Sequence, residues 1–455
     1  MKSLKLLVAS ILLVIFVYYC APYPIVQEHY SSSNYAKYSY QQIDKLKPSF
    51  ATSPLKAGVA KVDITPGIGV PMGGYGSITS RPNSGHSQKV YARAIALSND
   101  TQTVIILNAE FLLPLPFLID EVVKKSGLKR EQIYFTATHT HSGPGGYTKK
   151  LSSEFALGNF HDEYFNQLVS QLTTAIKRSQ ENLHNVTIHY TQTTLDPHTS
   201  QNMAPSRFDE NESPVPHQTT LHFLSLDTDE KTLALIATVN AHPTVYKSIN
   251  TKINGDYPGI LAAIMEQRCQ CIAAFAAGAV GGNSSPQLDN NLALEQTIKN
   301  YAEKLYAELT KDKLQSKIYQ ASEVSISADI LAVKLPDSVF HINENWKLNP
   351  RLFKLLLHDE NTYIHVLRIG DLVFAGFPAD YSEQLANKLI RWGNNNKTYI
   401  WPTSFNGDYI GYIMTSAQYE FPHYTTRDMN FFGKWTGDYL NDLTKAYLLQ
   451  RKPTP

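Results

Sequence analysis

The sequence predicts a mixed α/β (α+β) fold, in which central β-sheets are flanked by helices within one large domain. The 455 residues are 43% hydrophobic and 18% charged, so the chain can bury a large core and is not disordered over most of its length. Short runs rich in β-branched and aromatic residues alternate with longer runs of helical period. We find no internal repeat, and such an alternation favours sheets packed under helices.

The predicted elements follow this alternation along the chain. Strands are expected over 90–97, 103–108, 133–138, 186–193, 217–226, 233–240, 271–277 and 372–375. Helices are expected over 116–125, 161–182, 260–267, 294–314 and 435–449. The helix over 161–182 is the clearest, because Phe165, Leu168, Leu172 and Ile176 recur at steps of three and four residues.

Charge and cysteine content exclude some classes of protein. Lys plus Arg number 41 and Asp plus Glu number 40, and this balance argues against a nucleic-acid-binding protein. The three cysteines are too few for a disulfide framework. Cys269 and Cys271 are so close in sequence that we expect a structural role in an apolar segment rather than a disulfide.

The N-terminus resembles an export segment. Lys2 and Lys5 precede an apolar run over 6–19, which is short for a spanning helix. We therefore interpret residues 1–20 as a signal peptide or an uncleaved signal anchor. Lipid attachment at Cys20 is the less favoured alternative, because bulky tyrosines precede it.

The segment that follows is expected to be a tether. Residues 21–54 are rich in Tyr and Ser and show no helical period. The folded body is expected over 55–455.

The sharpest motif is Thr-His-Thr-His-Ser-Gly-Pro-Gly-Gly over 138–146, directly after a predicted strand. In an extended chain, His139 and His141 would share a face. Neutral imidazole is a common zinc ligand, and the glycines let the backbone approach a ligand closely. The pattern therefore indicates a metal or catalytic site at the end of this strand.

Three other strand ends carry polar groups. His242 follows the strand over 233–240, and Ser285 lies in a glycine-rich turn after the strand over 271–277. Asp380 follows the strand over 372–375, where it is either a ligand or the N-cap of the next helix. A tyrosine-rich stretch over 409–424 is suited to packing or to an amphipathic pocket.

Together these motifs resemble the N-terminal catalytic domain of the neutral ceramidases, zinc amidohydrolases that cleave the amide of ceramide. The resemblance covers about residues 55–440. It begins with Val-Asp-Ile-Thr-Pro at 62–66 and Met-Gly-Gly-Tyr at 72–75, and the motif over 138–146 is its most specific part. The segment over 282–287 is similar to the family's Gly-Asp-Val-Ser-Pro-Asn loop in altered form.

The resemblance implies a role for seven residues. One zinc ion per chain would be bound by His139, His242, Asp380 and Tyr412. Ser285, His141 and Tyr424 would act on the substrate side: His141 and Tyr424 as oxyanion donors, and Ser285 as a hydrogen-bonding group.

The chain departs from the family pattern at three positions. Asp380 stands where the family has Glu, Asn283 where it has Asp, and Met203 where it has a substrate-contacting Arg. The C-terminal β-sandwich of the long ceramidases is also not expected in this chain.

The activity implied by the resemblance is zinc-dependent hydrolysis of ceramide to a sphingoid base and a fatty acid, by an exported protein at a membrane surface. Two alternatives stay open. The same site acts on another exported N-acyl amide or ester, or the chain is a non-catalytic binding protein that keeps the fold.

Overall fold

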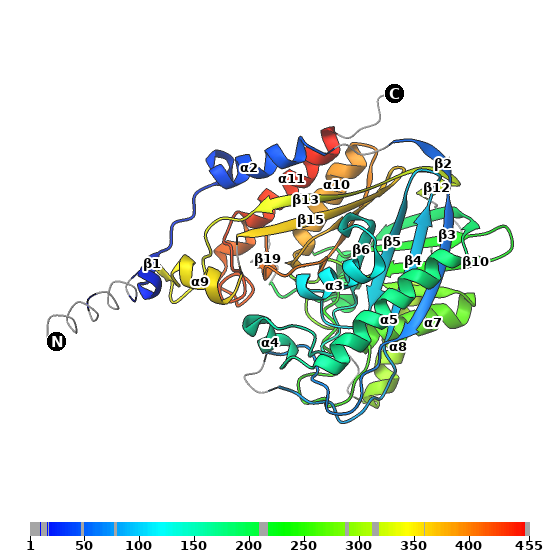
Figure 1. Cartoon of the computed structure of the whole chain (residues 1–455), viewed down its shortest axis with the longest axis horizontal. Coiled ribbons are helices and arrows are strands. Elements are labelled where there is room, and N and C mark those ends of the chain that lie inside the picture. Colours follow the sequence, from blue (N-terminus) through cyan, green and yellow to red (C-terminus); the bar gives the residue numbers. More distant parts are fainter. Residues whose placement is uncertain are drawn as a thin grey trace.

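The computed structural model describes residues 10, 16, 18–46, 50–76, 80–208, 217–286, 291–311, 318–358 and 360–450. Three five-stranded sheets with helices on their outer faces form the body, so the predicted mixed α/β class is confirmed (Figure 1). Most of the predicted export segment lies outside the described residues. None of the helices that are described combines the length and apolar character needed to cross a bilayer.

The first sheet has the strand order β6-β5-β4-β3-β7. β5 and β6 run parallel, and the other pairs are antiparallel. Helix α5 lies across β3 and β4, and α3 packs against α5 (Figure 1). The bounds are β3 Lys56–Asp63, β4 Tyr91–Ser98, β5 Thr103–Ala109, α3 Pro116–Ser126, η2 Arg130–Gln132, β6 Ile133–Ala137, α4 Leu151–Leu157, α5 Asp162–Glu181 and β7 His184–Asn185.

The second sheet has the order β11-β10-β9-β8-β12, and its parallel pair is β10 with β11. α7 and α8 pack against each other and cover this sheet through an apolar cluster that includes Leu261 and Leu305. The bounds are β8 Thr187–Thr194, α6 Pro197–Met203, β9 Thr220–Asp227, β10 Thr232–Thr238, α7 Asp256–Cys269, β11 Ile272–Phe275, α8 Leu294–Lys311 and β12 Tyr319–Ala321.

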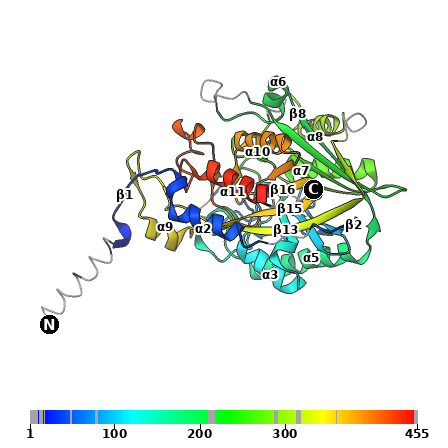
Figure 2. The same ribbon diagram turned by 90° about the horizontal axis from the view of Figure 1, so that it is seen from above.

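The third sheet has the order β18-β16-β15-β13-β2, with β16 and β18 parallel. α2, α10 and α11 lie along one another over this sheet (Figure 2). The bounds are β2 Thr52–Pro54, β13 Glu323–Lys334, α9 Pro350–Leu356, β15 Asn361–Ile369, β16 Leu372–Gly376, α10 Glu383–Asn395, β18 Tyr399–Thr403, η4 Gln418–Glu420 and α11 Thr436–Gln450.

The three sheets share one core. Ile95, Ile236 and Trp401 come from different sheets and belong to a single buried apolar cluster. The chain just past the parallel strands is also joined by backbone hydrogen bonds, because Ala277 donates to Ala137 (3.0 Å) and Ser404 donates to Ala277 (3.0 Å). The carboxyl ends of β6, β11 and β18 therefore meet at one place.

Two small sheets of two strands each complete the fold, one parallel and one antiparallel. β17 (Asp380–Tyr381) runs parallel to β19 (Tyr412–Ile413), and Asp380 is directly opposite Tyr412. β1 (Tyr23–Pro24) runs antiparallel to β14 (Trp346–Lys347). The second pair attaches the N-terminal segment to the third sheet's side of the molecule (Figure 2).

The expectation of an irregular tether over 21–54 is wrong for its middle. Residues Tyr30–Ser32 form the 3₁₀ turn η1, and Asn34–Ile43 form helix α2, whose N-cap is Ser33. Ala36 and Ile43 are buried in the cluster that also contains Leu440. The tyrosines mask the helical period, because several of them pack at the edge of the core rather than in solvent.

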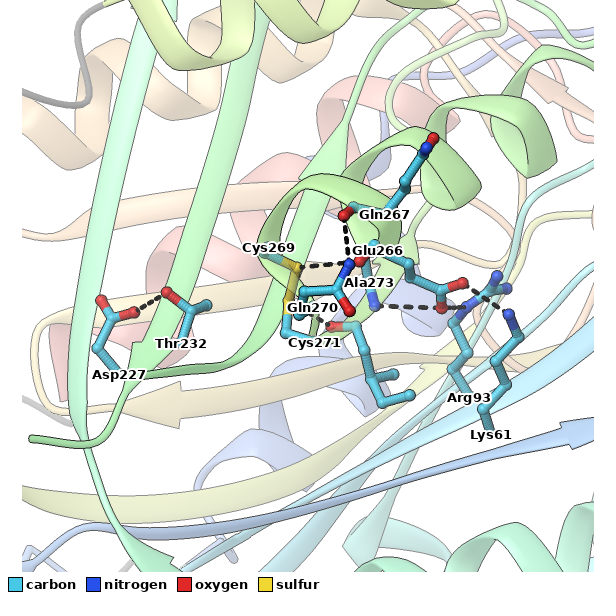
Figure 3. Close-up of a disulfide and its surroundings, with 11 residues drawn as sticks. Lys61, Arg93, Asp227, Thr232, Glu266, Gln267, Cys269, Gln270, Cys271 and Ala273 are labelled. Carbon is cyan, nitrogen blue, oxygen red and sulfur yellow. Dashed lines mark hydrogen bonds and ion pairs between the residues drawn. A yellow bond between two sulfur atoms is a disulfide. The ribbon is translucent and has the colours of Figure 1, made fainter. Parts of the chain in front are cut away.

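The expectation that Cys269 and Cys271 do not pair is also wrong. They form a disulfide between the end of α7 and the start of β11 (Figure 3). The residue between them, Gln270, has a left-handed backbone that ends α7, and this turn brings the two Cα atoms to 5.2 Å. That separation is within the usual range for a disulfide. One turn earlier, Glu266 accepts hydrogen bonds from Lys61 and Arg93, so the same helix end is also tied to the first sheet.

Candidate metal centre

His139 lies two residues past β6 and adopts a left-handed backbone conformation, with φ at +61°. Its ring stacks on Phe405 with 3.6 Å between ring centroids, and its Nδ1 lies 2.9 Å from the carbonyl oxygen of Leu112. A carbonyl only accepts, so Nδ1 carries the proton and Nε2 presents a lone pair. A strained backbone and a fixed tautomer are both typical of a metal-binding histidine.

His141 reaches the same point by a turn, not by the extended chain that the sequence suggested. Its Nε2 lies 3.2 Å from the Nε2 of His139, and the two rings are nearly perpendicular. Gly74 makes room for this ring, because a Cβ at position 74 would lie 2.7 Å from three atoms of His141. Tyr75 then packs edge-on against His141 and donates to the carbonyl of Thr244.

His242 enters from the end of β10. Its backbone N–H donates to Ser284 (3.1 Å), and its Nε2 lies 3.2 Å from the Nε2 of His141. Its Nδ1 lies 3.8 Å from Oδ1 of Asp380. This Nδ1 is buried and has no hydrogen-bond partner among the described residues.

Asp380 and Tyr412 lie side by side because β17 and β19 are paired in register. Tyr409 donates to Oδ2 of Asp380 at 2.7 Å, whereas the buried Oδ1 has no partner within the described part of the chain. Oδ1 also lies 3.8 Å from Nε2 of His139. The alternative that Asp380 caps the next helix is wrong, because Ser382 is the N-cap of α10.

Burial sets the charge state of these groups. It lowers the pKa of His139 to about 3 and holds the pKa values of His141 and His242 well below the usual range, so all three rings are neutral at pH 7. Burial raises the pKa of the Asp380 carboxyl to about 7, against the opposing hydrogen bond from Tyr409 and the charge of Arg207. Three neutral imidazoles therefore lie next to a buried carboxyl group. A bound cation would be stabilised by their lone pairs and by the carboxylate.

The donor atoms fit a metal ion in two overlapping ways. His139, His141 and His242 offer nitrogens that all lie within 4.8 Å of one another. His139 Nε2, His242 Nδ1 and Asp380 Oδ1 form a second set, with Tyr412 beside it. Two ligands of a tetrahedral zinc at about 2.0–2.2 Å lie roughly 3.3–3.6 Å apart, which both sets approach. Buried atoms without partners among the described residues occur in both sets: Nδ1 of His141, Nδ1 of His242 and Oδ1 of Asp380. The second set is the predicted one.

The remaining predicted residues lie around this cluster. Ser285 is half-buried and follows Ser284, whose carbonyl holds His242. Tyr424 is 41% exposed and packs edge-on against Tyr412, with 5.7 Å between the ring centroids. Ser285 is therefore next in sequence to a residue that holds the His242 backbone, and Tyr424 lies beside Tyr412 on the solvent side.

Arg207 is the main residue that sequence reasoning missed. It lies over the rings of Tyr412 and Tyr424, and its guanidinium lies 3.4 Å from the Tyr412 hydroxyl. Met203, by contrast, is buried in the apolar cluster under α7 and α8. An arginine is thus present at the site, four residues further along the chain than the motif indicated. Its backbone N–H donates to Gly282, a contact that no sequence pattern announces.

Asn283 has a clear structural reason to be an amide. Its Nδ2 donates to the carbonyl of Asn240 at 3.0 Å in a buried position. A carboxylate has no hydrogen to donate to that carbonyl. The Asn283 side chain therefore links the turn that carries Ser285 to the segment that carries His242.

Comparisons with known proteins indicate the family and the fold. Residues 55–320, more than half of the chain, match the family described as neutral/alkaline non-lysosomal ceramidase, N-terminal. The neutral ceramidase of Mycobacterium tuberculosis is 27% identical over 251 residues, which are 49% of this chain and 38% of that protein. The neutral ceramidase of Drosophila pseudoobscura pseudoobscura is 25% identical over 232 residues, which are 48% of this chain and 33% of that protein. The matched regions thus span about a third of these relatives' length.

A solved structure shares the fold over a wider range. The crystal structure of neutral ceramidase from Pseudomonas aeruginosa superposes with a TM-score of 0.71 at 19% identity, and the match covers 88% of this chain and 75% of that chain. The shared architecture therefore extends past residue 320, into the part that supplies Asp380 and Tyr412.

Proposed function

Because the chain belongs to the neutral/alkaline non-lysosomal ceramidase family, we propose that it is a zinc-dependent amidohydrolase that cleaves ceramide into a sphingoid base and a free fatty acid. The observation that carries this proposal is the convergence of His139, His242, Asp380 and Tyr412 from separate strand ends, with two buried donor atoms left without partners. The curated relatives that match bear the name neutral ceramidase.

Four side chains would hold the ion: His139, His242, Asp380 and Tyr412. A zinc ion bound there would polarise the amide carbonyl and make a water acidic enough to act as a nucleophile near pH 7. The backbone carbonyl of Leu112 orients His139, and the Tyr409 hydroxyl orients Asp380, as outer partners of metal ligands commonly do.

His141 and Tyr424 are suited to stabilise negative charge on the substrate oxygen. The His141 ring is neutral, and its Nε2 contacts both other histidines, so a proton on that nitrogen is aimed at the centre of the cluster. One well-placed donor of this kind is worth about 2.7–4 kcal/mol of barrier. Ser285 would hydrogen-bond the substrate rather than attack it. The sequence around Ser285 has neither the Gly-x-Ser-x-Gly turn of a serine hydrolase nor a nearby general base.

Arg207 would orient the polar part of the substrate. It lies between Tyr412 and the exposed Tyr424, where a planar guanidinium can donate to a hydroxyl or carbonyl group. The lipid chains would extend outward past the rings of Tyr412 and Tyr424.

We propose that the protein works at a membrane surface after export. The N-terminal lysines and apolar run support export, and so does the Cys269–Cys271 disulfide, which is typical of oxidising compartments.

The test is a hydrolysis screen of the zinc-loaded full-length chain against ceramide, short-chain N-acyl amino acids and simple esters, with release of free fatty acid as the readout. Ceramide turnover that disappears with a chelator and returns with zinc supports the proposal. Turnover of the other amides or esters without ceramide would assign the site to another acyl substrate. Absence of turnover by a zinc-loaded protein on all of them would identify a binding protein.

A further inference from the structure

A cavity lies away from the candidate metal centre, where the N-terminal segment meets the body. Its volume is about 360 Å³, and it is lined by residues of three stretches of chain, 23–28, 336–347 and 432–436, together with Tyr35 of α2. The β1–β14 pair closes one side of it, next to α9 in Figure 2. No residue proposed for hydrolysis lines this cavity.

Lys347 is the unusual residue of this cavity. It lies on β14 and is only 6% exposed. Among the described residues, its ammonium group has no hydrogen-bond acceptor and no carboxylate within ion-pair distance, although Asp337 acts on it from further away. Burial lowers the pKa of Lys347, because the charged form loses solvation that no nearby partner replaces.

The rest of the lining indicates which ligand would pair with this cation. Tyr35, Phe432 and Trp435 supply aromatic surface, and Val339 supplies aliphatic surface. A second cation on the lining, Lys434, is already paired with Glu420. One cation without a partner, beside aromatic and aliphatic surface, matches a single negative charge attached to a hydrocarbon body.

The lining also argues against highly charged ligands. Glu28 and Asp337 are both exposed and both line the cavity. Their carboxylates would repel a phosphate dianion or a nucleotide more strongly than a monoanion. A monocarboxylate with an apolar chain leaves these groups in solvent, and its own carboxylate meets the Lys347 ammonium.

We propose that this cavity binds a monocarboxylate with an apolar chain, and that Lys347 is the residue that pairs with the carboxylate. The inference rests on the cavity and its lining and does not require that the protein hydrolyse ceramide. If it does, the ligand belongs to the same chemical class as the fatty acid that the reaction releases.

The experiment is a calorimetric titration of the full-length chain with decanoate below its micelle concentration. We expect one saturable site. Decanol has the chain without the charge, and acetate has the charge without the chain, so both should bind more weakly by about tenfold or more. Equal binding of decanol and decanoate would overturn the role of Lys347, and absence of saturable binding would overturn the site.

Variants locate the site and separate it from the metal centre. Lys347→Met should weaken decanoate binding by about tenfold or more without lowering the unfolding midpoint, because it removes a buried charge that lacks a partner. Lys354→Met is the matched control, since Lys354 is an exposed lysine on α9 that pairs with Glu360, and it should change nothing. Should Lys347→Met fail to fold, Val339→Trp tests the same site by filling the cavity.

Two further readouts settle the location. Trp435 lines the cavity, so its fluorescence should change on decanoate binding, and this change should be absent from Trp435→Phe. His139→Ala should retain the decanoate site. Loss of decanoate binding in His139→Ala, with full binding in Lys347→Met, would place the fatty acid at the metal centre and refute the proposal.

Discussion

Asp380→Asn is the substitution that best separates the two ligand sets. It keeps the size of the side chain and removes its charge, while the Tyr409 hydroxyl can still donate to the remaining oxygen. Oδ1 of Asp380 lies 3.8 Å from a nitrogen of both His139 and His242 and has no other partner in the described structure. The variant therefore changes only the Asp380 ligand of the second set and leaves the three histidines intact.

The size of the effect follows from typical zinc energetics. A four-ligand structural site is worth about 10–16 kcal/mol, so one ligand contributes about 2.5–4 kcal/mol if the ligands share it evenly. That corresponds to about 100- to 1,000-fold in the zinc dissociation constant. A partner outside the ligand set typically costs about 10- to 100-fold, which is the effect we expect for Tyr409→Phe.

The assay is competition for zinc against a chromophoric chelator, together with thermal unfolding of the metal-free protein. Metal-free Asp380→Asn should unfold no earlier than the metal-free parent, because it loses a buried carboxyl whose Oδ1 is unpaired. His141→Gln is the matched control and should retain zinc. If Asp380→Asn keeps full zinc affinity while His141→Gln loses it, the three histidines are the ligands and our reasoning about Asp380 is refuted.

Three other substitutions test the rest of the site. His139→Ala and His242→Ala should each lose zinc and turnover while remaining folded, as measured by metal analysis and circular dichroism; full metal content in either would remove that residue from the ligand set. Ser285→Ala should lower turnover and retain zinc, and an acyl group trapped on Ser285 in the parent would instead indicate nucleophilic catalysis. Asn283→Asp should lower the free energy of unfolding by about 1–3 kcal/mol, since a carboxylate would face the Asn240 carbonyl, and an unchanged midpoint in urea would contradict the role of that hydrogen bond.

The sequence predicts those parts of the fold that depend on local pattern. β5 and α5 follow from β-branched runs and from helical period, and each lies close to its expected bounds. α2 was missed because its buried face is small and is interrupted by tyrosines. The Cys269–Cys271 disulfide was missed because it depends on a left-handed Gln270, and backbone conformation at a single residue is not visible in composition.

The site divides in the same way. Strand-end histidines and Asp380 are visible in the sequence, since each follows a recognisable apolar run. The distances between these side chains are not visible in the sequence, because the arrangement of the sheets in space is set by packing between residues far apart in the chain. Arg207 is the clearest case: it contacts Tyr412 across 205 positions. Backbone hydrogen bonds from Arg207 to Gly282 and from Ser284 to Pro205 hold its loop at the site. The proximity of His139 and His141 was predicted, but the cause is a turn at His139 rather than an extended chain.

The dispersal of the ligand atoms along the chain has a consequence for how the protein matures. During synthesis, His139 and His242 emerge well before Asp380 and Tyr412, and any fragment that contains the whole set must span residues 139–412. Contacts of such long sequence separation form late in folding, after the loops between them have closed. Metal capture through this set therefore reports that all three sheets have docked, and a chain truncated just before Tyr412 would contain the strands of all three sheets and still lack one of the proposed ligands. If the protein is exported before it folds, the ion must be acquired outside the compartment in which the chain is made.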